Sequence, residues 1–277
     1  MAIKIITDST CDIDRETVDQ LGISVVSAYV LFGEESFRQG VDINPTQFYA
    51  RLQSSPQLPS TSQPTPGDFT AAMEPLVSTG DQVVCLTVAR QLSGTYNSAA
   101  QAASQFDDRA VTVIDSGTAS VGHMLQVIAA AEDAASDDAT LDSVVSAAQI
   151  RAGRGYGFAM VDTLEYLQKG GRIGKAQAFM GSLLKVKPIL KVADGEVLPV
   201  DRPRNLRRGL QRLEELVREQ GKASKLAVAY TTDASPAQEM RDRLSDLADP
   251  DNTYTLQIGS AIGTHTGPGA VAVSTLP

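Results

Sequence analysis

The sequence contains no tryptophan, and its aromatic residues amount to only 5% of the chain. Proteins that bind single-stranded nucleic acid stack the bases on aromatic side chains, so nucleic acid is not an expected partner. The two cysteines, Cys11 and Cys85, have neither a metal-binding spacing nor the pattern of a disulfide framework. A reducing cytoplasm is therefore the expected location.

Long hydrophobic runs are also missing. The apolar stretch at the N-terminus reaches Asp8 too soon for a signal peptide, and the longest apolar run, at 25–32, has the length of a β-strand. We therefore expect neither secretion nor insertion into a membrane as an integral protein.

Several motifs of catalysis and cofactor binding are absent. The Gly-Lys pairs at 174–175 and 221–222 are each followed by alanine and lack the first glycine of a P-loop, so ATP binding by that motif is not expected. A Gly-x-Gly-x-x-Ala match at 267–272 has no following helix and strand to complete a dinucleotide site. The only histidines are His123 and His265, and no Gly-x-Ser-x-Gly is present. We expect no cofactor and no metal.

The first half of the chain alternates between strand and helix patterns. The strands are predicted at 3–7, 25–32, 83–88 and 111–115, and the helices at 45–52, 66–77, 118–134, 140–152 and from residue 93 onward. This alternation predicts an N-terminal α/β domain over 1–152 with a mostly parallel sheet. Ligands bind at the carboxyl ends of such strands, which here carry the loops 8–12, 59–66, 90–95 and 115–120.

After residue 152 the pattern changes to include a hairpin. Asp194-Gly195 separates two strand-like runs and is a strong signal for a tight turn. The predicted strands are 156–161, 186–192, 197–200, 226–231, 253–258 and 270–274, with helices at 163–169 and 204–220. We therefore predict a C-terminal α/β domain over 153–277 with a mixed sheet.

Three segments outside the predicted core are rich in uncharged hydrogen-bonding groups. Thr61 and Ser62 lie in a predicted loop before a helix whose N-cap is already supplied by Thr65. Ser93 can be an ordinary N-cap, but a helix N-terminus after a parallel strand can also bind an anion, and Gly94 would let the anion approach the backbone.

The third segment, at 262–269, carries His265 among glycines and threonines. A lone histidine is most often a structural residue, but these small neighbours favour a loop that faces a ligand. Hydroxyls, free amides and one imidazole together suit a single carboxylate or phosphate in a partly dry site.

Charge is unevenly distributed along the chain. The net charge is −9 overall, yet residues 167–218 carry 12 basic and 5 acidic groups, a net +7. This basic segment is either a solvated helix face or a docking surface for an anionic partner.

Five ordered blocks of the sequence resemble the signatures of the DegV family. They span nearly the whole chain and read Ile6-Thr7-Asp8-Ser9-Thr10, Thr61-Ser62-Gln63-Pro64-Thr65, Leu92-Ser93-Gly94-Thr95-Tyr96, Leu164-Glu165-Tyr166-Leu167 with Gly170-Gly171-Arg172-Ile173-Gly174, and Gly263-Thr264-His265-Thr266-Gly267-Pro268-Gly269. The resemblance implies two α/β domains with one long-chain fatty acid, such as palmitate or oleate, held in an apolar pocket between them.

The resemblance also implies a biochemical role. The protein would be the fatty-acid-binding subunit of a bacterial fatty acid kinase and would present the carboxylate to a separate ATP-binding subunit. The acyl phosphate that forms would feed phospholipid synthesis. The residues that match the carboxylate site are Thr61, Ser93 and His265, and the arginine that matches the kinase contact is Arg172. The alternative is a stand-alone serine hydrolase or acyltransferase that uses Ser93 activated by His265.

Overall fold

The computed structural model describes residues 2–152, 156–180 and 186–277. Its first half contains a parallel four-stranded sheet in the order β2-β1-β6-β7. The strands are β1 (Ile3–Asp8), β2 (Ser24–Val26), β6 (Gln82–Thr87) and β7 (Val111–Asp115). The predicted parallel sheet is confirmed.

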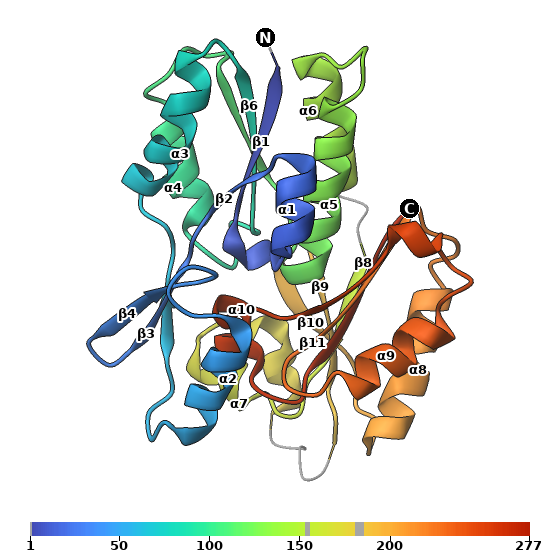
Figure 1. Ribbon diagram of the computed structural model, residues 1–277. Helices are drawn as coiled ribbons and strands as arrows, with labels where there is room; N and C mark the ends of the chain where they lie inside the picture. Colours follow the sequence, from blue (N-terminus) through green and yellow to red (C-terminus); the bar gives the residue numbers. More distant parts are fainter. Residues whose placement is uncertain (1, 153–155, 181–185) are drawn as a thin grey trace.

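Helices cover both faces of this sheet (Figure 1). They are α1 (Arg15–Leu21), α3 (Pro66–Ser78), α4 (Thr95–Ala103), α5 (Ser120–Ala134) and α6 (Leu141–Ala152). Helices α3 and α4 pack in one apolar cluster with the sheet, and α5 and α6 in another. Buried β-branched strand residues explain this arrangement, because both faces of a parallel sheet must be covered.

A small antiparallel sheet in the order β4-β3-β5 extends from the first. It contains β3 (Tyr29–Phe32), β4 (Glu35–Arg38) and β5 (Ser60–Ser62), and α2 (Pro45–Ser54) packs beside it. The prediction of one strand over 25–32 was therefore wrong. The chain leaves the first sheet at Ser27, and the Ala28 amide donates to the Ser9 hydroxyl (2.9 Å), so β2 and β3 belong to different sheets.

The second half forms a six-stranded mixed sheet in the order β10-β9-β8-β13-β11-β12. Its strands are β8 (Tyr156–Met160), β9 (Ile189–Ala193), β10 (Glu196–Asp201), β11 (Lys225–Tyr230), β12 (Thr253–Gln257) and β13 (Val271–Leu276). Strands β9 and β10 form the predicted hairpin, with φ 51° at Asp194 and 73° at Gly195. Two positive φ values are what a tight hairpin turn requires.

The remaining helices are α7 (Glu165–Lys169), α8 (Leu206–Arg218), α9 (Ser235–Arg243) and α10 (Ser260–Thr266), and short 3-10 turns lie at Ser9–Cys11, Gly174–Phe179 and Pro250–Asn252. Helices α8 and α9 pack on one face of the second sheet, and α5 of the first half packs on its other face. The predictions did not include α1, α9, α10, β4 and β5.

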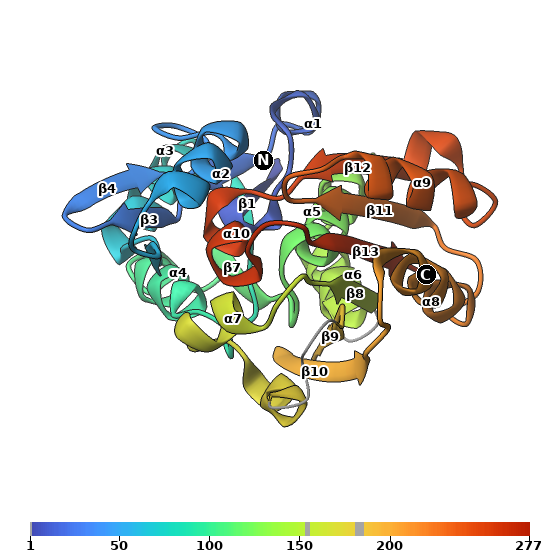
Figure 2. The same ribbon diagram turned by 90° about the horizontal axis from the view of Figure 1, so that it is seen from below.

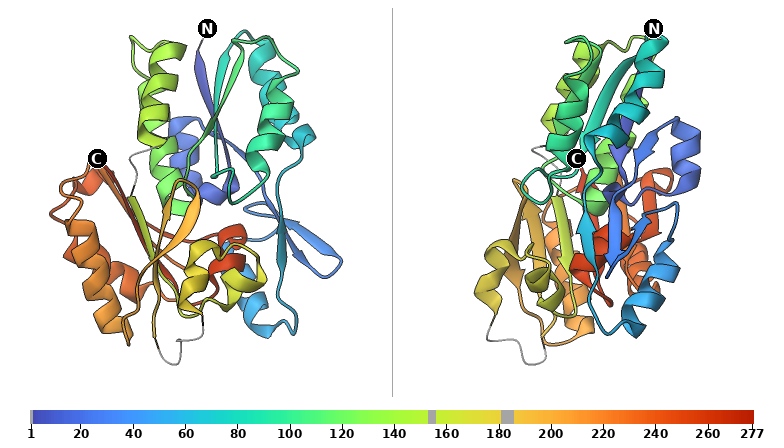
Figure 3. Two further views of the ribbon diagram at one scale, coloured as in Figure 1. Left: turned by 180° about the vertical axis from the view of Figure 1, so that it is seen from behind. Right: turned by 90° about the vertical axis from the view of Figure 1, so that its left-hand side faces the viewer.

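The two sheets meet end to face. The strands of the first sheet run downward in Figure 1, so their carboxyl ends point at the second sheet. Figure 2 shows α10 and α7 beside one another under this junction, and Figure 3 shows the two halves from behind and from one side. Every strand of the first sheet precedes residue 152, and every strand of the second follows it. The predicted domain boundary after residue 152 stays a prediction, because 153–155 lie outside the described residues. In the described part of the chain, no helix combines the length and apolar character needed to cross a membrane.

Candidate functional site

A pocket lies between the ends of the first sheet and the face of the second. It encloses about 1250 Å³ of space free of protein atoms, including the part that opens to solvent. Each of the four predicted ligand loops contributes to it, through Thr10, Thr61, Ser93 and Thr118. The second half supplies apolar side chains such as Leu190, Val192, Ile258 and Ile262. A mostly apolar wall with a few polar groups fits a largely apolar ligand that carries a polar group.

Thr61 and His265 meet at one end of the pocket. The Thr61 Oγ1 atom lies 3.0 Å from His265 Nε2, although the residues are 204 positions apart. Both residues had been predicted to lie in loops, and this was wrong. Thr61 is the middle residue of β5, and His265 lies in the last turn of α10. The small neighbour Gly263 is needed for packing, since a Cβ there would lie 2.4 Å from the Tyr49 hydroxyl.

The imidazole of His265 is neutral at physiological pH. Burial, together with the positive charge of Arg172, lowers the pKa of His265 to about 4. Its Nδ1 atom is buried and has no hydrogen-bond partner among the described residues. The backbone of Gly170 covers this atom so closely that a Cβ would lie 2.2 Å from it. Only Nε2 is therefore available for polar contacts.

Ser93 lies directly before α4, but it is not the N-cap of the helix. The N-cap is Gly94, which provides no side-chain hydrogen bond. The Ser93 hydroxyl instead lies 2.8 Å from the Thr95 hydroxyl and accepts a bond from the Thr95 amide (3.3 Å). If Thr95 donates its hydroxyl hydrogen to Ser93, the hydrogen of Ser93 is free to point into the pocket.

The other two predicted carboxylate contacts are placed less directly. Ser62 follows Thr61 on β5, and successive strand side chains point to opposite faces, so the two hydroxyls diverge. Ser62 lines the pocket but is exposed, and its hydroxyl makes only a long bond (3.4 Å) to the Gln63 carbonyl. Gly94 lies against the Gln63 side chain, because a Cβ added at Gly94 would lie 2.8 Å from Gln63 Nε2. Gly94 lines a polar groove beside the pocket.

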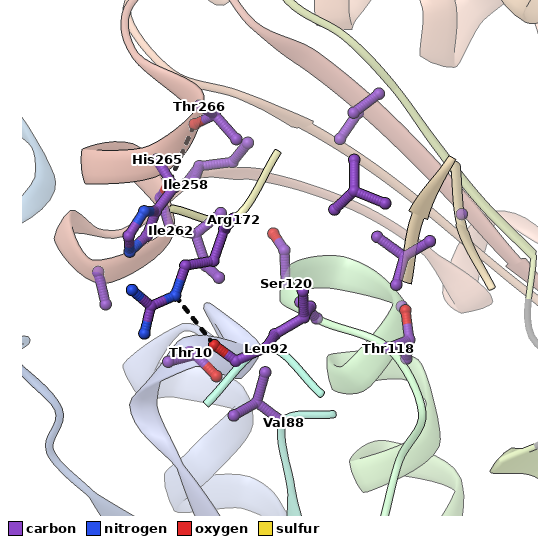
Figure 4. A pocket seen from close by; sticks show the side chains of 18 of the residues that line it. Thr10, Val88, Leu92, Thr118, Ser120, Arg172, Ile258, Ile262, His265 and Thr266 are labelled. Carbon is purple, nitrogen blue, oxygen red and sulfur yellow. Dashed lines mark hydrogen bonds between the residues drawn. The ribbon is translucent and has the colours of Figure 1, made fainter. Parts of the chain in front are cut away.

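Arg172 lies at the border between the pocket and this groove. Its Nε atom donates to the carbonyl of Leu92 (3.1 Å), and another guanidinium nitrogen donates to the carbonyl of Gly170 (2.8 Å). Figure 4 shows the bond to Leu92 and the guanidinium beside His265. Within the described residues Arg172 has no carboxylate partner, and Glu165 pairs with Lys169 instead.

Among the described residues, at least five of the twelve basic residues at 167–218 pair with carboxylates. The pairs include Lys175 with Glu196, Lys187 with Asp162, and Arg218 with Asp246. A docking surface for an anionic partner along the whole segment is therefore not supported, and Arg172 is the basic residue of the segment that borders both the pocket and the groove.

The arrangement does not favour a serine hydrolase. A nucleophile must lie within hydrogen-bond reach of its base, and the base must be oriented by a third group. Among the described residues, Ser93 bonds to Thr95 and His265 bonds to Thr61, and no bond joins Ser93 to His265.

A buried carboxylate in the predicted ligand loop 8–12 holds the two halves together. Asp12, in the left-handed conformation (φ 57°), accepts hydrogen bonds from the Gly259 amide (2.9 Å) and the Ser120 hydroxyl (2.6 Å). The Gln39 side chain lies within 3.4 Å of the same carboxylate. Burial raises the pKa of Asp12 to about 7. Only the fold brings these partners together, because Gly259 is 247 positions away.

Comparison with known proteins extends this description. A family model described as "Uncharacterised protein, DegV family" matches residues 2–277. A DegV domain-containing protein of Deinococcus radiodurans is 37% identical over 100% of this chain and 99% of its own length. Protein DegV of Bacillus subtilis is 32% identical over 99% of this chain and 98% of its own.

Solved structures agree in fold. A DegV family protein from Thermus thermophilus, described for its fatty acid binding, superposes with a TM-score of 0.93 at 31% identity over 100% of both chains. DegV from Bacillus subtilis, described as a fatty acid binding protein, has a TM-score of 0.89 at 31% identity over 100% of both chains. A stearic-acid-binding protein from Eubacterium ventriosum has a TM-score of 0.87 at 29% identity, over 99% of this chain and 98% of its own.

Proposed function

This chain belongs to the DegV family, and from that premise we propose that it binds one long-chain fatty acid and presents the carboxylate to a separate ATP-dependent kinase. The acyl chain occupies the pocket between the two halves, and the carboxylate lies beside Thr61, Ser93 and His265. The observation that carries the proposal is a largely apolar pocket in which two uncharged polar side chains, Thr61 and His265, lie 3.0 Å apart.

Two pairs of side chains prepare hydroxyl donors for the carboxylate. If Nε2 of the neutral His265 carries the proton, it donates to Thr61 Oγ1 and leaves the hydroxyl hydrogen of Thr61 for the ligand. Thr95 can do the same for Ser93. Hydrogen bonds to an ionised acceptor are stronger than neutral ones, so two such donors favour the carboxylate over an uncharged head group.

The apolar wall accounts for most of the affinity. Burying about fourteen methylenes of a palmitate-like chain, at about 0.8 kcal/mol each, stabilises the complex by at most about 11 kcal/mol. Immobilising the chain costs several kcal/mol of this. The remainder still permits tight binding, and the polar end mainly fixes the orientation of the ligand.

A separate kinase is part of the proposal because the chain has no P-loop of its own. The polar groove next to the pocket shares Leu92, Ser93 and Arg172 with it, so a partner bound there would face the carboxylate. Arg172 has no carboxylate partner among the described residues and can attract an acidic partner or a phosphate. Supply of acyl phosphate for phospholipid synthesis would follow from this coupling.

Denaturing extraction of the purified protein, followed by mass spectrometry, tests the carrier function. We expect about one fatty acid per chain, or stoichiometric uptake of added palmitate or oleate after delipidation. Folded protein that neither contains nor takes up fatty acid would refute the proposal. Incubation with acyl esters and no partner is the control for the hydrolase alternative, and turnover there would favour that alternative.

A further inference from the structure

The far side of the pocket from His265 is not purely apolar. Thr118 lies on the opposite side from His265 in the close view, with its hydroxyl directed toward the pocket (Figure 4). Only 7% of Thr118 is exposed, and its hydroxyl has no hydrogen-bond partner in the described part of the chain. A plain alkyl chain at this place would leave the hydroxyl unpaired, which is unfavourable for a buried polar group.

The first turn of α5 adds backbone donors at the same place. The 15-residue helix begins with Ala119 as N-cap and has no side-chain cap. Over the described residues, the amides of Val121 and Gly122 also make no bond to another backbone or side-chain group. A helix N-terminus without a cap retains free N–H groups and a favourable dipole for an electron-rich atom.

Gly122 brings these donors and the hydroxyl together. A Cβ at Gly122 would lie 2.8 Å from Thr118 Oγ1 and 3.2 Å from Ser274 Oγ, so both hydroxyls lie against the open face of the first turn. Ser274 lies on β13 of the second sheet, so both halves of the molecule contribute. All three residues line the pocket.

From this juxtaposition we propose that the pocket has a second polar subsite, which accepts a hydroxyl group carried on the distal half of a long-chain fatty acid. The ligand oxygen accepts from the free amides of α5, and its hydrogen is donated to Thr118 Oγ1. A second carboxylate is disfavoured, because neither Thr118 nor Ser274 can neutralise its charge. The inference rests on the proposed function, since the carboxylate end must be held beside Thr61 and His265.

Competition binding against octadecanoic acid tests this subsite. The probes are octadecanoic acids hydroxylated at successive carbons of the distal half. We expect one positional isomer to bind about tenfold more tightly than octadecanoic acid, the equivalent of one added hydrogen bond. Thr118→Val should remove this preference while octadecanoic acid binds at least as well as before.

Thr266→Val is the matched control. Thr266 lines the same pocket, but its hydroxyl already donates to the Ile262 carbonyl (3.1 Å), so the preference for the hydroxylated acid should persist. Two results would overturn the inference alone: octadecanoic acid binds but no isomer is preferred, or the preference survives in Thr118→Val. Failure of octadecanoic acid, palmitate and oleate alike to bind the wild-type protein would instead refute the proposed function.

Discussion

Replacement of Thr61 by valine separates the polar end of the pocket from its apolar wall. Valine keeps the shape of threonine and suits the strand β5, so the fold should be retained. The variant loses the hydroxyl that lies 3.0 Å from His265 Nε2, and with it the proposed donor to the carboxylate. A hydrogen bond to a charged group contributes about 1.5–3 kcal/mol.

That loss predicts a roughly 10- to 150-fold weaker binding of the fatty acid. The apolar wall, with its upper bound of about 11 kcal/mol, is unaffected, so the variant still binds long chains. The loss should therefore appear as a changed preference. Wild-type protein should favour hexadecanoic acid over hexadecanol, and Thr61→Val should favour it much less.

Displacement of a fluorescent fatty acid by the acid and by the alcohol measures both affinities in one assay. Thr61→Ser, which keeps the hydroxyl, is the control and should retain the preference of the wild type. If Thr61→Val and His265→Ala both kept the full preference for the acid, the carboxylate would bind elsewhere in the pocket and the reasoning would be refuted.

Three other changes test the electrostatics. Fatty acid binding should raise the pKa of His265 from about 4, because a nearby carboxylate favours the charged imidazole. An NMR titration with and without ligand measures this pKa, and an unchanged value would place the carboxylate away from the ring. The pKa of Asp12 is about 7 in the folded protein against 3.8 for an unperturbed carboxyl. The free energy of unfolding should therefore fall by a few kcal/mol as pH rises from about 4 to about 7 and level off above. Urea unfolding of Asp12→Asn should show no such fall, and an equal fall in both proteins would assign it to other groups. Arg172→Ala should keep its fatty acid and melting temperature but lose turnover with the kinase, most clearly at low salt. Lys175→Ala, which removes a cation already paired with Glu196, should keep turnover. Loss of lipid in Arg172→Ala would mean that Arg172 holds the ligand rather than the kinase.

The starts of α2 and α3 were predictable because their signals are local. Asn44 and Thr65 each precede a proline, and both accept the hydrogen bonds of a capping box at the start of α2 and α3. The hairpin turn at Asp194-Gly195 was equally local. These signals depend on a few neighbouring residues and do not require contacts with the rest of the chain.

The errors have a common cause in long-range contacts. Residues 25–32 have the composition of one strand, and the break at Ser27 arises because Ala28 bonds to Ser9. In the same way, the meeting of Thr61 with His265 depends on α10 packing back against the small sheet. The sequence identified both residues as candidate polar contacts for a ligand, but only the fold shows that they lie together.

The apolar wall was beyond sequence reasoning for a different reason. Ile258 and Ile262 line the pocket, yet their residue types are the same as those that fill the core clusters. A hydrophobic pattern reports that a side chain avoids water and does not report whether its neighbour is protein or ligand.

The neutral character of the carboxylate site has a consequence for transfer of the ligand. An arginine in direct contact would hold a fatty acid by a strong, partly desolvated ion pair, and a partner would have to replace it. Here Arg172 is engaged with the carbonyls of Leu92 and Gly170, and the groups proposed to hold the carboxylate are hydroxyls and a neutral imidazole. In the proposed complex the carboxylate would therefore keep most of its negative charge available to a partner in the adjacent groove. A phosphoryl donor needs such an electron-rich oxygen as its acceptor, so a weakly compensated carboxylate is better suited to transfer than a tightly paired one.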